Sequence, residues 1–123
     1  MNDFHILVVD DDEDTAQLLK LILQDTIEHC TVGVAYDGVE AIESVRRTLP
    51  TFVVFDLEMP RMDGEVAANH LLKELGAKAP MLLAVSGNAL RVDGLRLSGP
   101  FTHCFTKPLD LEKLIGVLSA PRC

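Results

Sequence analysis

Short apolar runs and longer amphipathic segments alternate along this chain. Five runs of five to seven residues are mostly rich in β-branched or aromatic side chains: "FHILVV" (4–9), "CTVGVAY" (30–36), "FVVFD" (52–56), "PMLLAVS" (80–86) and "THCFTK" (102–107). Runs of this length and composition indicate β-strands. The fifth run has the least apolar pattern of the set.

The segments between these runs carry the periodicity of α-helices, with apolar residues recurring at i, i+3, i+4 and i+7 or i+8. Three stripes follow this spacing: Leu19, Ile22, Leu23 and Ile27; Ala68, Leu71, Leu72 and Leu75; and Leu111, Leu114, Ile115 and Leu118. Segment 37–49 begins with acidic and ends with basic residues, as the helix dipole favours. Segment 88–99 is also expected to be helical, although Gly94 interrupts it and its apolar stripe is poor.

Alternating strands and helices predict an α/β fold with a parallel sheet. Each helix returns the chain to the start of the next strand, so helices cover both faces and the fold has three layers. Because both faces are covered, the strands read as nearly continuous apolar runs. We therefore expect one doubly wound domain with a five-stranded sheet over residues 1–123. In such sheets a ligand binds beyond the carboxyl ends of the strands.

The composition narrows the possible classes of protein. The 123 residues are 48% hydrophobic and 24% charged, as in globular domains, and no apolar run approaches the roughly 20 residues of a membrane span. A net charge of −8 disfavours direct binding to nucleic acid, whose phosphates would repel such a surface. Cys30, Cys104 and Cys123 are odd in number and widely spaced, which is typical of reduced thiols in a cytoplasmic protein.

Charged and polar side chains follow the predicted strands at their carboxyl ends. The first strand leads into three aspartates, the third ends in Asp56, the fourth ends in Ser86 and the fifth ends in Lys107. Neighbouring carboxylates need a cation to be ionised together, and an all-oxygen ligand set favours a hard ion, of which Mg²⁺ is the most available in the cytoplasm. A metal flanked by a hydroxyl and an ammonium suits a phosphoryl group. Asp56 would then be the nucleophile that forms an aspartyl phosphate.

Each of these residues also has an ordinary structural explanation. Asp12 or Asp14 could cap the first helix, Ser86 or Asn88 could cap the fourth, and Lys107 alone could be a surface lysine. Their joint arrival at the same edge of the sheet favours a functional site.

Four motifs in this order resemble the receiver domain of two-component response regulators: "ILVVDDDED", "VVFDLEMPRMDGE", "LLAVSG" and "FTKPLD". The resemblance covers about residues 4 to 120 and implies a (βα)5 flavodoxin-like fold. It also implies that Asp56 accepts a phosphoryl group from a phosphohistidine on a sensor histidine kinase or a histidine phosphotransfer protein.

The resemblance assigns roles around a Mg²⁺ ion. Asp11 corresponds to the direct metal ligand and Asp10 to the one that usually acts through water. Asp56 corresponds to the phosphoacceptor and to a further metal ligand. Glu58 occupies the position whose backbone carbonyl normally completes the metal shell.

The resemblance also assigns the residues that respond to the phosphoryl group. Ser86 corresponds to the hydroxyl that follows the group and signals its presence. Lys107 corresponds to the lysine that pairs with the phosphoryl oxygens, and the Lys107–Pro108 bond to one that is usually cis.

Three features depart from the family pattern. Cys104 stands where an aromatic switch residue is usual, so a switching side chain there would be much smaller. Segment 99–107 is one residue longer than usual and contains Pro100, which predicts an atypical surface between the fourth helix and the fifth strand. Glu58 adds a carboxylate beside Asp56, and we expect it to change the lifetime of the phosphoryl group modestly, in an unknown direction.

The expected function is a phosphorylation-controlled signalling switch that assists only its own phosphorylation and dephosphorylation. With no output domain in residues 1–123, it would signal by protein contact, through the surface of the fourth helix, fifth strand and fifth helix, as a stand-alone regulator or as a domain of a hybrid kinase. One alternative is a Mg²⁺-dependent phosphatase of the haloacid-dehalogenase type, although its DxDx[TV] run is absent after the first strand. Another is a degenerate receiver that binds partners without phosphorylation.

Overall fold

The computed structural model describes residues 3–59, 62–97 and 99–119. Five parallel strands form one sheet in the order β2-β1-β3-β4-β5. Their bounds are β1 Phe4–Val9, β2 Cys30–Ala35, β3 Phe52–Asp56, β4 Met81–Ser86 and β5 His103–Thr106. The five-stranded doubly wound fold predicted from the alternation of patterns is confirmed, and all five strands lie within a residue or two of the predicted runs.

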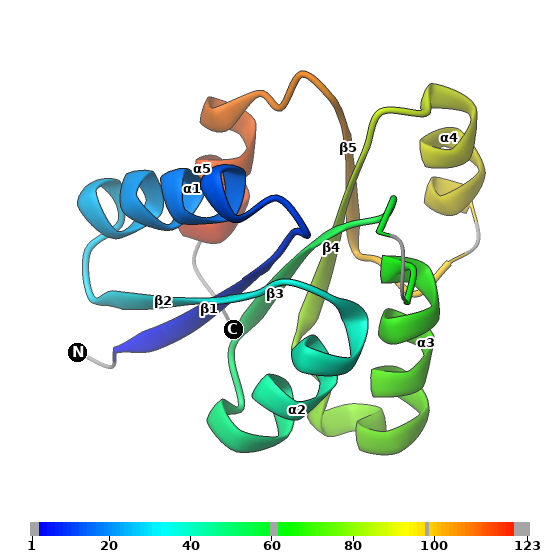
Figure 1. Cartoon of the computed structure of the whole chain (residues 1–123), viewed down its shortest axis with the longest axis horizontal. Coiled ribbons are helices and arrows are strands. Elements are labelled where there is room, and N and C mark those ends of the chain that lie inside the picture. Colours follow the sequence, from blue (N-terminus) through cyan, green and yellow to red (C-terminus); the bar gives the residue numbers. More distant parts are fainter. Residues whose placement is uncertain (1–2, 60–61, 98, 120–123) are drawn as a thin grey trace.

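The helices cover both faces of the sheet, as Figure 1 shows. They are α1 Glu13–Thr26, α2 Gly38–Thr48, α3 Gly64–Leu75, α4 Ala89–Leu97 and α5 Leu111–Ser119, with a short 3₁₀ turn, η1, at Gly76–Lys78. One apolar core lies between the sheet and α1 and α5, and it includes Leu23, Leu114 and Leu118. The other lies between the sheet and α2, α3 and α4. The helix stripes therefore face the sheet as their spacing predicts.

Strand β3 lies at the centre of the sheet, between β1 and β4. All five of its residues are buried, because helices cover both of its faces. The chain order reverses beside β1, which pairs with β2 on one side and with β3 on the other. This switch point leaves a crevice beyond the carboxyl ends of β1 and β3, where ligands bind in open α/β sheets.

Helix α4 forms despite its weak apolar pattern. Asn88 caps it, since the Asn88 side-chain oxygen accepts the backbone N–H of Arg91 at 3.1 Å. Val92 and Leu95 are buried, at 0% and 7% exposure, and they anchor the helix to the sheet. No helix within the described ranges is long and apolar enough to cross a membrane.

Candidate functional site

The carboxyl ends of β1 and β3 bring three aspartates together. Asp10 and Asp11 follow β1, and Asp56 is the last residue of β3. Each of them offers a carboxylate oxygen, and these oxygens all lie within 4.8 Å of one another. Asp10 and Asp56 are buried, whereas Asp11 is exposed. The spacing and the all-oxygen donor set suit a small hard cation such as Mg²⁺.

Asp12, the third aspartate after β1, caps helix α1, which is the structural role that its sequence position allowed. Its side chain accepts the backbone N–H groups of Asp14 and Thr15 and so caps α1. Its own backbone N–H donates to Oδ1 of Asp10 at 3.0 Å, which orients that carboxylate at the end of the strand. One run of aspartates therefore supplies both the helix cap and the acidic cluster.

The buried carboxyls have perturbed acidities. The pKa of Asp56 is raised to about 6, chiefly by burial and next by the neighbouring Asp10 carboxylate, against the lowering effect of Lys107. The pKa of Asp10 is also raised, chiefly by burial, against the lowering effect of the Asp12 backbone N–H. Two buried carboxyls at this distance repel each other when both are ionised, and a cation between them would relieve that repulsion.

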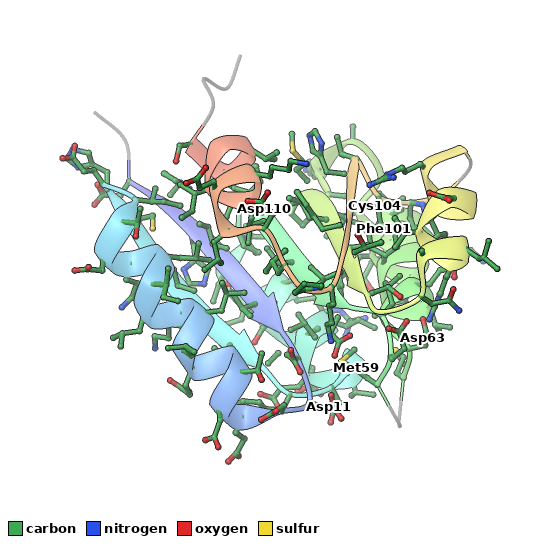
Figure 2. The ribbon with its side chains drawn as sticks, turned by 90° about the horizontal axis from the view of Figure 1, so that it is seen from above. Asp11, Met59, Asp63, Phe101, Cys104 and Asp110 are labelled. Atoms are coloured by element: carbon green, nitrogen blue, oxygen red, sulfur yellow. The ribbon has the colours of Figure 1, made fainter. Side chains whose placement is uncertain are left out.

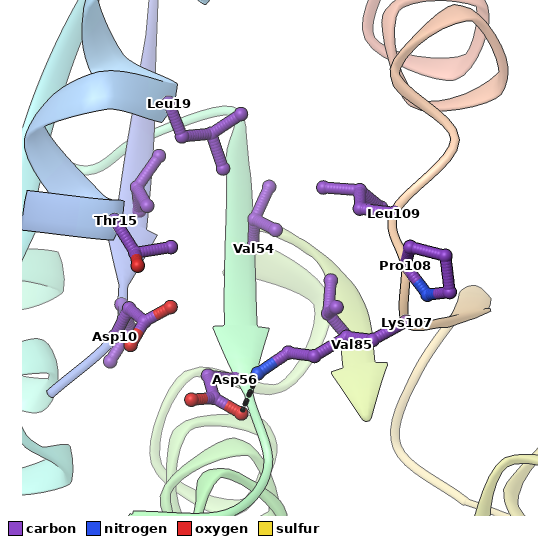
Figure 3. Close-up of a pocket in the computed structure, with 11 residues that line it drawn as sticks. Asp10, Thr15, Leu19, Val54, Asp56, Val85, Lys107, Pro108 and Leu109 are labelled. Carbon is purple, nitrogen blue, oxygen red and sulfur yellow. Dashed lines mark hydrogen bonds and ion pairs between the residues drawn. The ribbon is translucent and has the colours of Figure 1, made fainter. Parts of the chain in front are cut away.

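Lys107 reaches the acidic cluster from β5, which lies two strands away from β3 in the sheet. It follows β5, and its Nζ lies 3.4 Å from Oδ1 of Asp56, as the dashed line in Figure 3 shows. The backbone of Lys107 is held in place by its N–H, which donates to the carbonyl of Ser86 at 2.9 Å. The Lys107–Pro108 bond is cis, as expected. Asp56 thus lies between a carboxylate and an ammonium.

A cavity of about 300 Å³ extends inward from Asp56. In Figure 3, Asp10, Asp56 and Lys107 lie at one end of it, and Leu19, Val54 and Leu109 lie at the other. Its inner walls are apolar, which keeps a low-dielectric surface beside the carboxylates and accounts for the strong effect of burial on their pKa values.

Ser86 ends β4 and is completely buried, at 0% exposure. Its hydroxyl lies 2.9 and 2.8 Å from the two carboxylate oxygens of Glu58, to which it donates. Its oxygen accepts the backbone N–H of Asn88 at 3.0 Å. The Glu58 side chain is therefore engaged in the protein and is not merely a solvated neighbour of Asp56.

Arg91, on the first turn of α4, is a site residue that sequence reasoning missed. It donates to Glu58 at 2.9 Å and to both carboxylate oxygens of Asp63 at 2.6 and 2.7 Å. No motif singles it out, because its partners lie 33 and 28 positions earlier in the chain. The only available signal was a basic residue three positions after a possible helix cap, Asn88, and close to the site motifs.

Cys104 lies on the buried face of β5. It is 7% exposed and belongs to the same apolar core as Phe101, while Phe105 points to the opposite core, as strand alternation predicts. Figure 2 shows Phe101 and Cys104 between β5 and α4. Burial raises the pKa of the Cys104 thiol, and Arg96 donates to the Cys104 carbonyl at 3.0 Å. Whether Cys104 moves during switching stays a prediction.

Comparisons with known proteins agree with this geometry. The family model of the response regulator receiver domain matches residues 6–119. A 14.6 kDa protein from the sodA1 3′ region of Leptolyngbya boryana is 36% identical over 92% of this chain and 86% of its own length. The response regulator MprA of Mycobacterium ulcerans is 32% identical over 94% of this chain, which spans only 48% of MprA.

A solved structure of a receiver domain has the same fold. The signal receiver domain of a DNA-binding response regulator from Colwellia psychrerythraea 34H is 25% identical, with a TM-score of 0.83 over 94% of this chain and 95% of that one. The match to the family model over residues 6–119, together with the fold, shows that this chain belongs to the family of response regulator receiver domains.

Proposed function

We propose that this receiver domain accepts a phosphoryl group on Asp56 from a histidine kinase or histidine phosphotransfer protein, in a Mg²⁺-dependent reaction. The observation that carries the proposal is the position of Asp56. It is a buried carboxyl at the end of the central strand, within 4.8 Å of two other carboxylates and 3.4 Å from the Lys107 ammonium. Its pKa of about 6 leaves it ionised, and hence nucleophilic, at neutral pH.

The acidic cluster fits a divalent cation. Asp11 would bind it directly, Asp10 directly or through water, and Asp56 with one carboxylate oxygen, while the backbone carbonyl of Glu58 is proposed as a further ligand. When bound, Mg²⁺ would neutralise the carboxylates and the charge on the transferred group.

In the proposed transfer, an Asp56 carboxylate oxygen attacks the phosphorus of the phosphohistidine. The O–P bond forms as the P–N bond breaks, and the electron pair of that bond stays on the imidazole nitrogen of the donor. Lys107 lies beside Asp56 and would pair with the phosphoryl oxygens. After transfer, the Ser86 hydroxyl would donate a hydrogen bond to a phosphoryl oxygen.

The proposed output is contact with a target protein. We assign it to the α4–β5–α5 surface, where Arg96 ties α4 to the backbone of β5. On this proposal the chain has no external substrate and works in the cytoplasm, where its kinase and Mg²⁺ are available. The family match favours this function and gives no support to the haloacid-dehalogenase alternative.

The test is phosphorylation followed by intact mass. The protein and an Asp56→Asn variant are incubated with acetyl phosphate and Mg²⁺, and then with a cognate phosphohistidine donor. We expect an adduct of one phosphoryl group that needs Mg²⁺, is base-labile and is missing from the variant. Absence of an adduct from the phosphohistidine donor would refute the proposal, and rapid turnover of phosphate esters would favour a phosphatase.

A further inference from the structure

The Glu58 carboxylate accepts hydrogen bonds from Ser86 and Gly87, at the end of β4. Besides the Ser86 hydroxyl, the backbone N–H of Gly87 donates to Glu58 Oε1 at 3.1 Å. Two donors at the end of β4 thus converge on one carboxylate from the β3–α3 loop, 28 and 29 positions earlier in the chain. These are donors of the kind that an anion on Asp56 would also attract, and Glu58 is only two residues from Asp56.

Arg91 keeps Glu58 in this position. Its side chain is only 24% exposed and bridges Glu58 to Asp63, and it also lies 3.3 Å from Glu65. Asp63 is itself held as the N-cap of α3, where it accepts the backbone N–H of Glu65. The ion pairs therefore join three structures: the loop after Asp56, the start of α3 and the first turn of α4.

Ser86 gives a second connection to α4. Its oxygen accepts the N–H of Asn88, and Asn88 caps α4 through the N–H of Arg91. If the Ser86 hydroxyl turned away from Glu58, the hydrogen bond to Asn88 would change with it. The start of α4 is thus linked to Ser86 by the backbone and to Glu58 by Arg91.

We propose that Glu58 is a latch that holds Ser86, Gly87 and the start of α4 in the resting arrangement, and that Arg91 is the positioning residue that keeps the latch closed. This inference rests on the proposed phosphorylation of Asp56. A phosphoryl dianion on Asp56 repels Glu58 and competes for the Ser86 and Gly87 donors. The latch then opens, and Arg91 transmits its release to α4.

The first test uses the unphosphorylated protein, so its result is independent of whether Asp56 can be phosphorylated. Amide hydrogen exchange is measured by NMR in wild type, Glu58→Ala and Glu65→Ala. Glu65→Ala is the matched control. It also removes a carboxylate that pairs with Arg91, but Glu65 does not contact Ser86. We expect the Gly87 amide to exchange about tenfold faster in Glu58→Ala, as for the loss of one hydrogen bond to a charged group, and to stay unchanged in Glu65→Ala. Equal exchange in the two variants would overturn the latch.

The second test measures competition with the phosphoryl group. With acetyl phosphate and Mg²⁺, we expect Glu58→Ala to form the Asp56 adduct about tenfold faster than wild type, and Glu65→Ala to stay within about twofold of it. Glu58→Ala keeps the backbone carbonyl, so it leaves that proposed metal ligand in place. Equal rates of adduct formation in Glu58→Ala and Glu65→Ala would show that Glu58 does not compete with the phosphoryl group. If wild type forms no adduct from any donor, the proposed function fails, while the exchange result still decides the latch contacts.

The third test asks whether Arg91 transmits the change. Hydrogen exchange across residues 89–97 is compared before and after phosphorylation in wild type and in Arg91→Met, with Arg91→Lys as the conservative variant. We expect phosphorylation to alter exchange in wild type, to have little effect in Arg91→Met and to recover part of its effect in Arg91→Lys. An undiminished response in Arg91→Met would overturn the role of Arg91.

Discussion

Asp56 shows how a single buried carboxylate can be both unfavourable for stability and useful for function. It is 6% exposed, and ionising it beside Asp10 is unfavourable in the absence of a cation. Lys107 compensates only in part, since its side chain is 43% exposed and pairs with Asp56 at 3.4 Å. The proposed reactivity of Asp56, and not a contribution to folding, is therefore the reason we give for a carboxylate at this position.

The first prediction concerns Asp56→Asn in the absence of Mg²⁺. The pKa of Asp56 in the folded protein, about 6, is above its unfolded value of 3.8, so ionisation destabilises the fold. This destabilisation is absent below pH 3.8 and complete above about pH 6. We expect Asp56→Asn to be more stable than wild type by roughly 1–3 kcal/mol at pH 7, and the difference to shrink as pH falls through this window.

Urea unfolding at several pH values would measure this difference. Asp25→Asn is the control, because Asp25 is an exposed residue of α1 and changes the net charge equally. A variant at position 56 that is less stable than wild type at pH 7 would contradict the expected destabilisation by the buried charge.

At the scale of elements, the junction between β3 and α3 positions the site. Gly64 begins α3, and a Cβ atom there would lie only 2.6 Å from the backbone oxygen of Asp56. The helix can approach the end of β3 closely because this residue has no side chain. Gly64 therefore does more than end the loop after β3, since it sets how near α3 comes to Asp56.

The second prediction follows from this close approach. Gly64→Ala should destabilise the protein by about 1–3 kcal/mol, because the backbone must shift to admit the methyl group, and it should slow formation of the Asp56 adduct. Gly116→Ala is the matched control: it lies within α5 with nothing within 4 Å of its Cβ, so it should stabilise the protein by about 0.5–1 kcal/mol. Chemical denaturation and adduct mass would measure both effects. Equal stability of the two variants would contradict the steric explanation.

The elements differ in how far their sequences determine them. Strand β3 and helices α1, α3 and α5 have strong apolar patterns, and they form in the segments that these patterns predict. Helix α4 has a poor stripe and an internal glycine, and the Asn88 cap and the buried Val92 and Leu95 hold it in place. Its existence depends more on packing against the sheet than on periodicity, which is why its sequence predicts it poorly.

At the scale of the whole molecule, the site joins strands that are distant in sequence. Asp10 and Asp11 follow β1, Asp56 ends β3 and Lys107 follows β5, and the order β2-β1-β3-β4-β5 brings them to one edge. A cation bound there would link β1 to β3 and offset the repulsion between their carboxylates. Metal binding and stability are thus expected to be coupled in this protein.

The third prediction is that Mg²⁺ stabilises the folded protein. At about ten times its dissociation constant, Mg²⁺ should add about 1.4 kcal/mol, which corresponds to a rise in Tm of about 5 °C for a domain of this size. Thermal unfolding with Mg²⁺ and with EDTA would measure the rise. Asp11→Asn should abolish it, and because Asp11 is exposed this variant should fold normally. An equal rise in Asp11→Asn would show that the ion binds elsewhere.

The sequence alone determined the fold class and the members of the acidic cluster. Both follow from local patterns: periodicity defines the elements, and residues that follow parallel strands must meet at one edge of the sheet. Only the tertiary structure decided where the side chains of Glu58 and Arg91 lie. Their contacts join residues 26 to 33 positions apart, across separate loops. Such contacts depend on strand order, loop conformation and rotamers, none of which periodicity encodes.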